Sequence, residues 1–175
     1  RHAAHPGADD AIRGLAEDLV ALAGVPAGPA HADLGRTTIT PTVLRAGEAR
    51  NRVPGTASAV LDVRSVPGDA HAAIVERLRA GLSGRVGIRS SRLESVATDP
   101  EAAIVAAALA VRPEARVYGS PTMSDMVFLA DRPVIKCGPG QSRRSHTADE
   151  YVLASELEAG RAFYRGLLEA FGEGE

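Results

Sequence analysis

The stretch Cys137–Tyr151 carries the residue types and spacing most suited to chemistry, and it reads Cys-Gly-Pro-Gly-Gln-Ser-Arg-Arg-Ser-His-Thr-Ala-Asp-Glu-Tyr. Its glycines, Gly138 among them, let backbone amides approach a ligand closely. His146 follows, and histidine is the commonest metal-ligand side chain and a frequent general base. Thr147 and Glu150 have the spacing of a capping box, which predicts a helix start just after the histidine and hence a positioned imidazole. The alternative is a surface loop with an incidental histidine.

Other catalytic patterns fit the sequence poorly. The serines lack a Gly-x-Ser-x-Gly elbow, and the glycine turn lacks the spacing of a phosphate loop or a dinucleotide fingerprint. Neither a histidine pair at helical spacing nor a carboxylate cluster supplies the three or four ligands of a zinc site. Cys137 near His146 would allow a thiol nucleophile, but its position directly after an apolar segment predicts a buried structural cysteine.

The elements that would position these residues begin with residues 1–92. Apolar residues at helical spacing predict helices over 10–23 and 70–82, with Asp9 or Asp10 as the first N-cap. Alternation and β-branched residues predict strands over Thr37–Arg45, with Pro41 at an edge or bulge, over Ala57–Arg64, and around Val86 and Ile88.

This order is helix, strand, strand, helix, strand, which becomes the βαββαβ pattern of a ferredoxin-like α/β sandwich if one strand precedes Arg1. The chain also begins on Arg1 rather than on methionine. Both features lead us to expect that the chain is a truncated one.

The remaining residues, 93–175, change in character. Asp99-Pro100-Glu101 predicts the start of a helix that ends near residue 111, and a short helix is predicted over 125–129. Short apolar strands are predicted over 115–118 and 133–136, which would form part of a parallel, doubly covered sheet. A last helix is predicted to begin with a capping box at Ser155 and Glu158, and its apolar face would consist of Leu157, Tyr164, Leu168 and Phe171.

Composition bounds the class of protein. With 45% hydrophobic and 3% aromatic residues in 175, the chain can build an aliphatic core. The net charge of −2 gives no reason to expect nucleic acid or an anionic membrane as partner. A single cysteine excludes an internal disulfide framework and fits a reducing compartment, so we expect a cytoplasmic protein. No apolar run approaches the ~20 residues of a membrane span.

Four segments together resemble one family. They are His2–Ile12, the pair Asn51–Pro54 and Leu61–Arg64, the dipeptide Ser124-Asp125, and the stretch from Gly138-Pro-Gly140 to His146-Thr-x-x-Glu150. In order and spacing they resemble the zinc-dependent acetylornithine deacetylase, succinyl-diaminopimelate desuccinylase, aminoacylase and carboxypeptidase family.

The resemblance implies an α/β fold with two parts. Residues 1–92 would be a βαββαβ ferredoxin-like lid that mediates homodimerisation, and residues 93–175 would be the C-terminal portion of a zinc-peptidase-like catalytic domain. The N-terminal catalytic half, which carries most metal ligands and the general base, would be absent. The intact enzyme would hold two zinc ions, or cobalt, and hydrolyse the amide bond of an N-acyl amino acid.

The resemblance also implies roles for individual residues. His146 would be a metal ligand, and His2 would reach into the partner subunit's site and steady the developing oxyanion. Asn51 and Arg64 would bind the substrate's polar and carboxylate groups across the dimer, and Gly138 would bind substrate. The alternatives are a flexible terminal histidine for His2, turn chemistry for Asn51 and a salt bridge with Asp62 for Arg64. His5 is interpreted as a local contact.

One departure from the family pattern matters, because Thr122-Met123 stands where the family has Gly-Thr before Ser124-Asp125. The closest subgroup is that of the deacetylases of arginine and lysine biosynthesis. We expect a deacetylase fragment that is inactive alone. The alternative is a non-catalytic dimerisation and ligand-binding module, and a third hypothesis is a small enzyme that uses Cys137 and His146.

Overall fold

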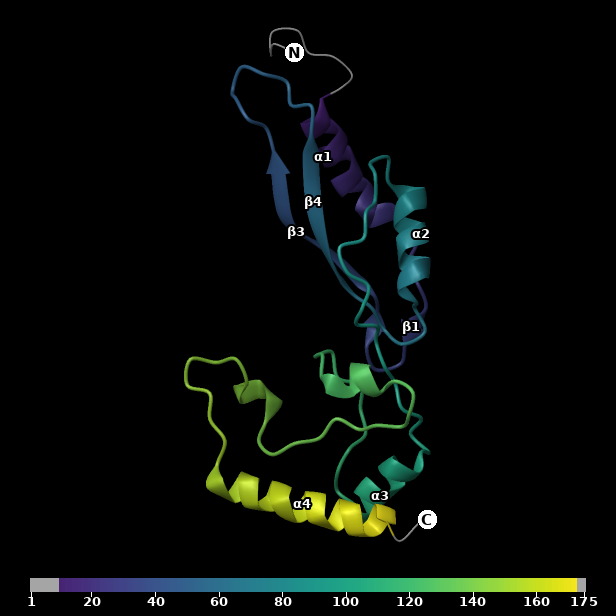
Figure 1. The fold of residues 1–175 in the computed structure, drawn as a ribbon, viewed down its shortest axis with the longest axis vertical. Coiled ribbons are helices and arrows are strands. Elements are labelled where there is room, and N and C mark those ends of the chain that lie inside the picture. The colour runs from purple at the N-terminus through teal and green to yellow at the C-terminus, as the bar shows by residue number, and fades with distance from the viewer. Residues whose placement is uncertain (1–9, 173–175) are drawn as a thin grey trace. The chain divides into compact units, whose positions relative to one another are not determined.

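The computed structural model describes residues 10–172, while residues 1–9 and 173–175 lie outside the described part. The chain divides into two compact units, residues 1–95 (unit 1) and residues 96–175 (unit 2). Unit 1 contains α1 (Ala11–Ala21), the 3-10 helix η1 (Leu22–Gly24), β1 (Ala30–His31), β2 (Gly35–Arg36), β3 (Thr38–Ala46), β4 (Ala57–Arg64) and α2 (His71–Gly81) (Figure 1). Unit 2 contains α3 (Ala103–Val111), the 3-10 helices η2 (Asp125–Leu129) and η3 (Ser142–Arg144), and α4 (Ala154–Gly172).

Unit 1 is organised around the long β3–β4 hairpin. The two strands are antiparallel, with Thr38 opposite Arg64 at one end and Ala46 opposite Ala57 at the other. The register shifts by one residue between Pro41 and Val43. Proline has no N–H group to donate to the neighbouring strand, and a bulge accommodates the missing hydrogen bond. The predicted bulge at Pro41 is therefore confirmed.

Helix α1 packs against this hairpin and is anchored at both ends. Asp10 caps it by accepting hydrogen bonds from the backbone amides of Ile12 (3.0 Å) and Arg13 (3.3 Å). In the last turns of α1, the Asp18 carboxylate accepts hydrogen bonds from the backbone amides of Ser83 and Gly84, each at 2.8 Å. The predicted cap at Asp10 is confirmed, and Asp18 ties α1 to the chain that follows α2.

A buried ion pair fixes α2 in unit 1. Asp69 lies just before the helix, and its carboxylate accepts hydrogen bonds from the Arg77 guanidinium at 2.8 and 2.9 Å and from the Thr37 hydroxyl at 2.6 Å. The buried apolar residues of α2 are Ile74 and Leu78. The polar and apolar contacts together hold α2 to the start of the hairpin.

The predicted strand around Val86 and Ile88 is wrong, because these residues belong to no helix or strand and pair with no strand in the described part. Among residues 10–95 the strands form two separate antiparallel pairs, β1–β2 and β3–β4. The four-stranded sheet of a ferredoxin-like lid is therefore not present in the described part. β-Propensity alone does not make a strand, because its N–H and C=O groups need a partner strand.

Unit 2 is built on the packing of α3 against α4. Its buried residues are Val105 and Ala107 of α3 and Gly160 and Leu167 of α4. A Cβ atom added at Gly166 would lie 3.0 Å from Cγ1 of Val111, so the absence of a side chain lets the helices approach closely. Gly160 and Leu167, seven residues apart, lie on the packed face of α4.

The four apolar residues predicted to form one face of α4 lie on the observed helix, but that face is exposed rather than buried in the described part of the chain. Leu157, Tyr164, Leu168 and Phe171 are all exposed, and Leu168 is 75% exposed. Helical periodicity identifies which residues share a face, but the position of the neighbouring helix decides which face is buried.

The predicted parallel sheet in unit 2 is also wrong, because residues 96–172 contain no strand. Around residue 134 a side chain replaces the expected strand partner. The Thr98 hydroxyl donates to the carbonyl of Val134 and accepts from its amide at 3.0 Å. Both backbone groups of Val134 are thereby satisfied without a ladder.

The two capping boxes predicted in unit 2, Thr147 with Glu150 and Ser155 with Glu158, are wrong as well. Helix α4 begins at Ala154, and Glu156 accepts a hydrogen bond from the Leu153 amide at 2.9 Å, which is the reciprocal half of a capping box. Thr147 instead donates its hydroxyl to the carbonyl of Arg144 at 2.8 Å, so no helix starts there. The carboxylate of Glu158 pairs with Arg161 at 2.9 Å.

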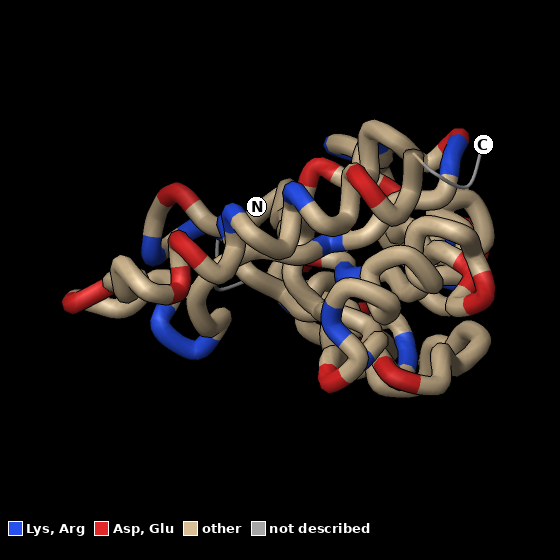
Figure 2. The backbone as a smooth tube through the Cα atoms, turned by 90° about the horizontal axis from the view of Figure 1, so that it is seen from below, with Lys and Arg blue, Asp and Glu red and all other residues tan. Residues whose placement is uncertain are grey.

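Acidic and basic residues are interspersed along the described chain, without a continuous basic strip in the view of Figure 2. No helix of the described residues is long and apolar enough to span a membrane.

Candidate functional site

His146 has the most unusual backbone of the described chain. Its φ is 60°, and it is the one non-glycine residue in the described part with positive φ. Its amide donates to Oε2 of Glu150 at 3.0 Å, which holds the turn. A left-handed conformation costs about 1–2 kcal/mol for a residue with a side chain, and such strain is concentrated at functional sites. The residue is exposed, and the structure shows no partner for its ring among residues 10–172.

The loop around His146 is fixed by a half-buried ion pair. The guanidinium of Arg144 donates to Oε2 of Glu156 at 2.7 Å and lies 4.6 Å from the centre of the Tyr151 ring. The Leu153 amide and then Arg144 hold the pKa of Glu156 below its usual value, because both favour the charged carboxylate. These contacts restrict the chain on both sides of the histidine.

The glycine turn is positioned by α4. The Tyr164 hydroxyl donates to the carbonyl of Cys137 at 2.8 Å. A Cβ atom at Gly160 would lie 3.1 Å from Cβ of Pro139, so α4 leaves space for the proline of the turn. Gly140 has φ of 85°, which favours glycine. Burial, followed by the nearby Cys137 thiol, raises the pKa of Tyr164.

Two sequence predictions about this turn have different outcomes. Cys137 is exposed, so the prediction of a buried structural cysteine is wrong. The apolar segment before it suggested burial, but no described part of the chain buries the cysteine. Gly138 is also exposed, and a Cβ atom there would meet only Oη of Tyr164, at 3.9 Å. The backbone of Gly138 is therefore open to a ligand, and its role in substrate binding stays a prediction.

The dipeptide Ser124-Asp125 begins the short helix η2, whose bounds agree with the predicted 125–129. The preceding turn, Ser120–Thr122, is held by Lys136, whose ammonium donates to the Ser120 and Thr122 hydroxyls and to the Thr122 carbonyl. Sequence reasoning missed both Lys136 and Tyr164, because neither belongs to a motif.

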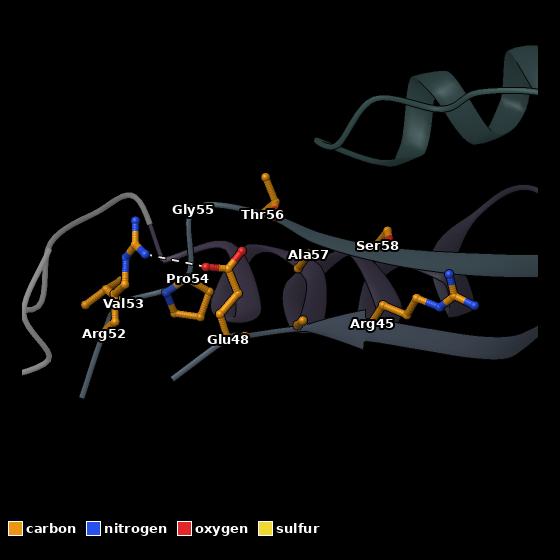
Figure 3. Close-up of a pocket in the computed structure, with 11 residues that line it drawn as sticks. Arg45, Glu48, Arg52, Val53, Pro54, Gly55, Thr56, Ala57 and Ser58 are labelled. Carbon is orange, nitrogen blue, oxygen red and sulfur yellow. Dashed lines mark hydrogen bonds and ion pairs between the residues drawn. The ribbon is translucent and has the colours of Figure 1, made fainter. Parts of the chain in front are cut away.

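In unit 1 the hairpin turn forms a shallow pocket of ≈ 490 Å³ (Figure 3). Asn51 lies in this turn, which is closed by a hydrogen bond from the Arg52 amide to the Ala49 carbonyl at 3.3 Å. Figure 3 shows the Arg52 guanidinium pointing to the Glu48 carboxylate, with 3.5 Å between the paired atoms. Asn51 is exposed, so its side chain is accessible at the end of the hairpin.

Arg64 lies at the opposite end of the hairpin from Asn51. The seven steps from Ala57 to Arg64 correspond to about 24 Å at 3.4 Å per residue in an antiparallel strand. Nε of Arg64 donates to Asp62 at 2.6 Å, which is the surface pair considered from the sequence. Its side chain is 64% exposed, so its terminal nitrogens remain accessible to a carboxylate. Asn51 and Arg64 of one chain are too far apart to hold one small substrate together.

The candidate metal ligands form an incomplete set. Residues 10–172 contain no group of three or more His, Cys, Asp or Glu side chains placed to hold a metal ion. His146 has an accessible imidazole that suits zinc, so it fits the role of one ligand. His2, the predicted oxyanion donor, and His5 lie outside the described residues.

Comparisons with known proteins give two matches. Residues 1–86 match the model of the peptidase dimerisation domain of M20 type. A protein of Pyrobaculum aerophilum described as a LysW-lysine/LysW-ornithine hydrolase is 31% identical over 125 residues, which are 69% of this chain. The chain spans 36% of the length of that relative.

Proposed function

We propose, from the M20 peptidase family that these two matches support, that the chain is part of a metal-dependent hydrolase that cleaves the amide bond of an N-acyl amino acid. Residues 1–95 would act as the dimerisation and lid module, and residues 96–175 as part of the catalytic domain. N-Acetylornithine and its close relatives are the substrates to test first. We propose a cytoplasmic homodimer and zinc as the metal, with cobalt as a substitute.

The observation that carries this proposal is the conformation of His146. A histidine in a strained left-handed conformation, held by Glu150 and exposing an unpartnered ring, is suited to be a metal ligand contributed by a loop. A metal bound there would supply a Lewis acid and an activated water. Because the described residues provide one candidate ligand, we infer that the other ligands and the general base come from outside residues 10–172 and that the 175-residue chain is inactive alone.

The remaining predicted residues have roles in binding. Arg64 would pair with the substrate carboxylate through its terminal nitrogens, while Nε keeps its bond to Asp62. Asn51 would donate or accept a hydrogen bond at the polar end of the substrate, and Gly138 would offer backbone atoms. His2 would donate to the oxyanion that develops during hydrolysis.

The length of the hairpin adds a constraint to this arrangement. β4 spans about 24 Å from Ala57 to Arg64, and Asn51 lies in the turn beyond Ala57, so one substrate molecule can contact both Asn51 and Arg64 only if they come from different protomers. The active site is therefore proposed to be shared between the two subunits of a dimer. This arrangement gives the dimerisation module a direct part in catalysis.

The proposal is tested with the full-length protein as its gene encodes it. The expected results are bound zinc and hydrolysis of N-acetylornithine, both lost on chelation and in the variant His146→Ala. A full-length protein that binds ligand as a dimer, but contains no metal and hydrolyses no N-acyl amino acid, would instead be a non-catalytic binding module.

A mixing experiment tests the shared site. Asn51→Ala and Arg64→Ala are each expected to be nearly inactive as homodimers. After the two variants are unfolded and refolded together, half of the dimers are mixed and each has one intact site, so activity returns to about a quarter of wild type if the interface is two-fold symmetric. Absence of recovery in dimers shown to be mixed would contradict a site shared between protomers.

A further inference from the structure

Lys136 is the one lysine in a sequence whose other 19 basic residues are arginines. Every other cationic side chain of the lysine and arginine type in this chain is therefore a guanidinium. The two side chains differ physically: arginine is a planar fork of five donors, while lysine is a compact ammonium with three rotatable donors. Whether a guanidinium could replace the ammonium therefore depends on the contacts of Lys136.

The contacts of Lys136 suit an ammonium. Its Nζ donates to Oγ of Ser120 at 3.2 Å, to the carbonyl of Thr122 at 3.3 Å, and to Oγ1 of Thr122. The two hydroxyls lie 3.0 Å from each other, and the Thr122 amide is 3.4 Å from Oγ of Ser120. Three acceptors crowded around one point match the three donors of an ammonium, whereas a guanidinium holds its donors in one plane and matches them less well.

The two ends of this contact belong to different loops of unit 2. The turn Ser120–Thr122 ends two residues before Ser124-Asp125, and Lys136 directly precedes the glycine turn Cys137–Gly140. Because residues 96–172 contain no strand, backbone pairing does not fix these loops to each other. The ammonium of Lys136 is a polar link between these two loops.

We propose that Lys136 is a positioning residue that sets the geometry of Ser124-Asp125 relative to the glycine turn, and that an ammonium is required for this. The relevance of this geometry to catalysis rests on the proposed amide hydrolase function; the geometry itself does not. All three donors of Lys136 are engaged by the turn, so a direct role in holding a substrate anion is disfavoured.

The test uses the full-length protein with Lys136→Met, Lys136→Arg and a matched control, Arg116→Met, which removes an exposed cation elsewhere in unit 2. Hydrogen exchange of peptides covering residues 119–125 and 137–140 is measured, together with kcat and KM for N-acetylornithine. We expect faster exchange in both loops and a fall in kcat/KM of about 10- to 100-fold for both Lys136 variants, as misplacement of binding groups causes. Arg116→Met should match wild type.

A second measurement needs no substitution at Lys136. An amine-selective acylating reagent is applied to wild type and to Thr122→Val, and the rate at Lys136 is followed by peptide mass spectrometry. Loss of the Thr122 hydroxyl should release the amine and raise its labelling rate about tenfold. An unchanged rate would show that the amine is not held by this turn.

The outcomes separate the two proposals. Wild-type exchange and kinetics in Lys136→Arg would overturn the requirement for an ammonium. Faster exchange in Lys136→Met with unchanged kcat and KM would overturn the positioning role. If the wild-type protein hydrolyses no N-acyl amino acid, the proposed function fails, while exchange and labelling still decide whether Lys136 holds the two loops.

Discussion

Replacement of Asp69 by alanine should destabilise unit 1 by about 3 kcal/mol. The Asp69 side chain is 1% exposed and accepts hydrogen bonds from Arg77 and Thr37. The substitution leaves the Arg77 guanidinium, which is 21% exposed, without its counter-ion. Breaking a buried pair in this way costs about 3–5 kcal/mol, and we expect the lower end because a partly exposed Arg77 can turn toward water.

The reciprocal change and a matched control sharpen this prediction. Arg77→Met leaves a carboxylate that is almost fully buried, so its cost should be nearer 5 kcal/mol. Arg79→Met, on the same helix, breaks an exposed pair with Glu76 whose side chains are 49% and 71% exposed, and should cost less than about 0.5 kcal/mol. The double variant Asp69→Ala/Arg77→Met should cost less than the sum of the two single changes, because neither charge is left unpaired.

Urea unfolding at pH 7 and fixed protein concentration, followed by far-UV circular dichroism, measures these differences. Hydrogen exchange of the amides in His71–Gly81 assigns the loss to unit 1. If Asp69→Ala and Arg79→Met are equally stable, or if the two changes at the buried pair are simply additive, the ion pair does not stabilise α2 as argued.

Three further predictions concern local structure. Gly28→Ala would place a Cβ atom 2.3 Å from Oδ2 of Asp69, so the same urea titration should show a loss of about 1–3 kcal/mol, and a neutral result would contradict the close approach. The lowered pKa of Glu156 means that its charged form stabilises the fold fully above the ordinary pKa of 4.5 and progressively less as the pH falls through the lowered value. Glu156→Gln should therefore lower Tm at pH 7, and the difference from wild type should shrink toward pH 3; a difference that is constant with pH would refute this. His146→Gly should raise stability by about 1 kcal/mol while metal affinity falls at least about tenfold, whereas His146→Ala should lose metal without the gain in stability. Equal stability of the glycine and alanine variants would show that the backbone at this position is not strained.

The elements that the sequence predicted well are those determined by local chemistry. Asp10 caps α1 because its carboxylate reaches two amides of the first turn, a contact within four residues of chain. β4 has the predicted bounds, and the bulge follows from the missing donor of Pro41. Each of these features depends on residues close in sequence or on a pairing that one tight hairpin enforces.

The strands predicted around residues 86–88, 115–118 and 133–136 depended instead on partners. An apolar run shows that a segment can lie in a sheet, but the ladder needs a second strand at 4.7–4.9 Å, and none is present beside these segments in the described residues. Thr98 shows what replaces the ladder, since one hydroxyl satisfies both backbone groups of Val134.

The packing of α4 shows the same limit for helices. The predicted face of α4 was chosen from its large apolar residues. Two close contacts of the helix are instead made where a side chain is absent, at Gly160 against Pro139 and at Gly166 against Val111. A glycine in a helix costs about 1 kcal/mol relative to alanine, so Gly160 and Gly166 each already indicated a possible point of close approach. The buried residues of α4 are one small residue, Gly160, and one large residue, Leu167, so size alone does not locate the packed face.

The candidate site was predictable as a set of residues but not as a geometry. Asn51 and Arg64 stand 13 positions apart in the sequence, which hides the fact that a strand runs between them and places them at opposite ends. His146 was identified by its type and neighbours, but its left-handed backbone and the bond from its amide to Glu150 are seen only in the structure. Lys136 could be noticed in the sequence because it is the one lysine of the chain. The three acceptors around its ammonium could be found only in the structure. Residue type and spacing therefore selected the groups that can react, and the distances between backbone elements decide which of them can act on one substrate molecule and which require a second copy of the chain.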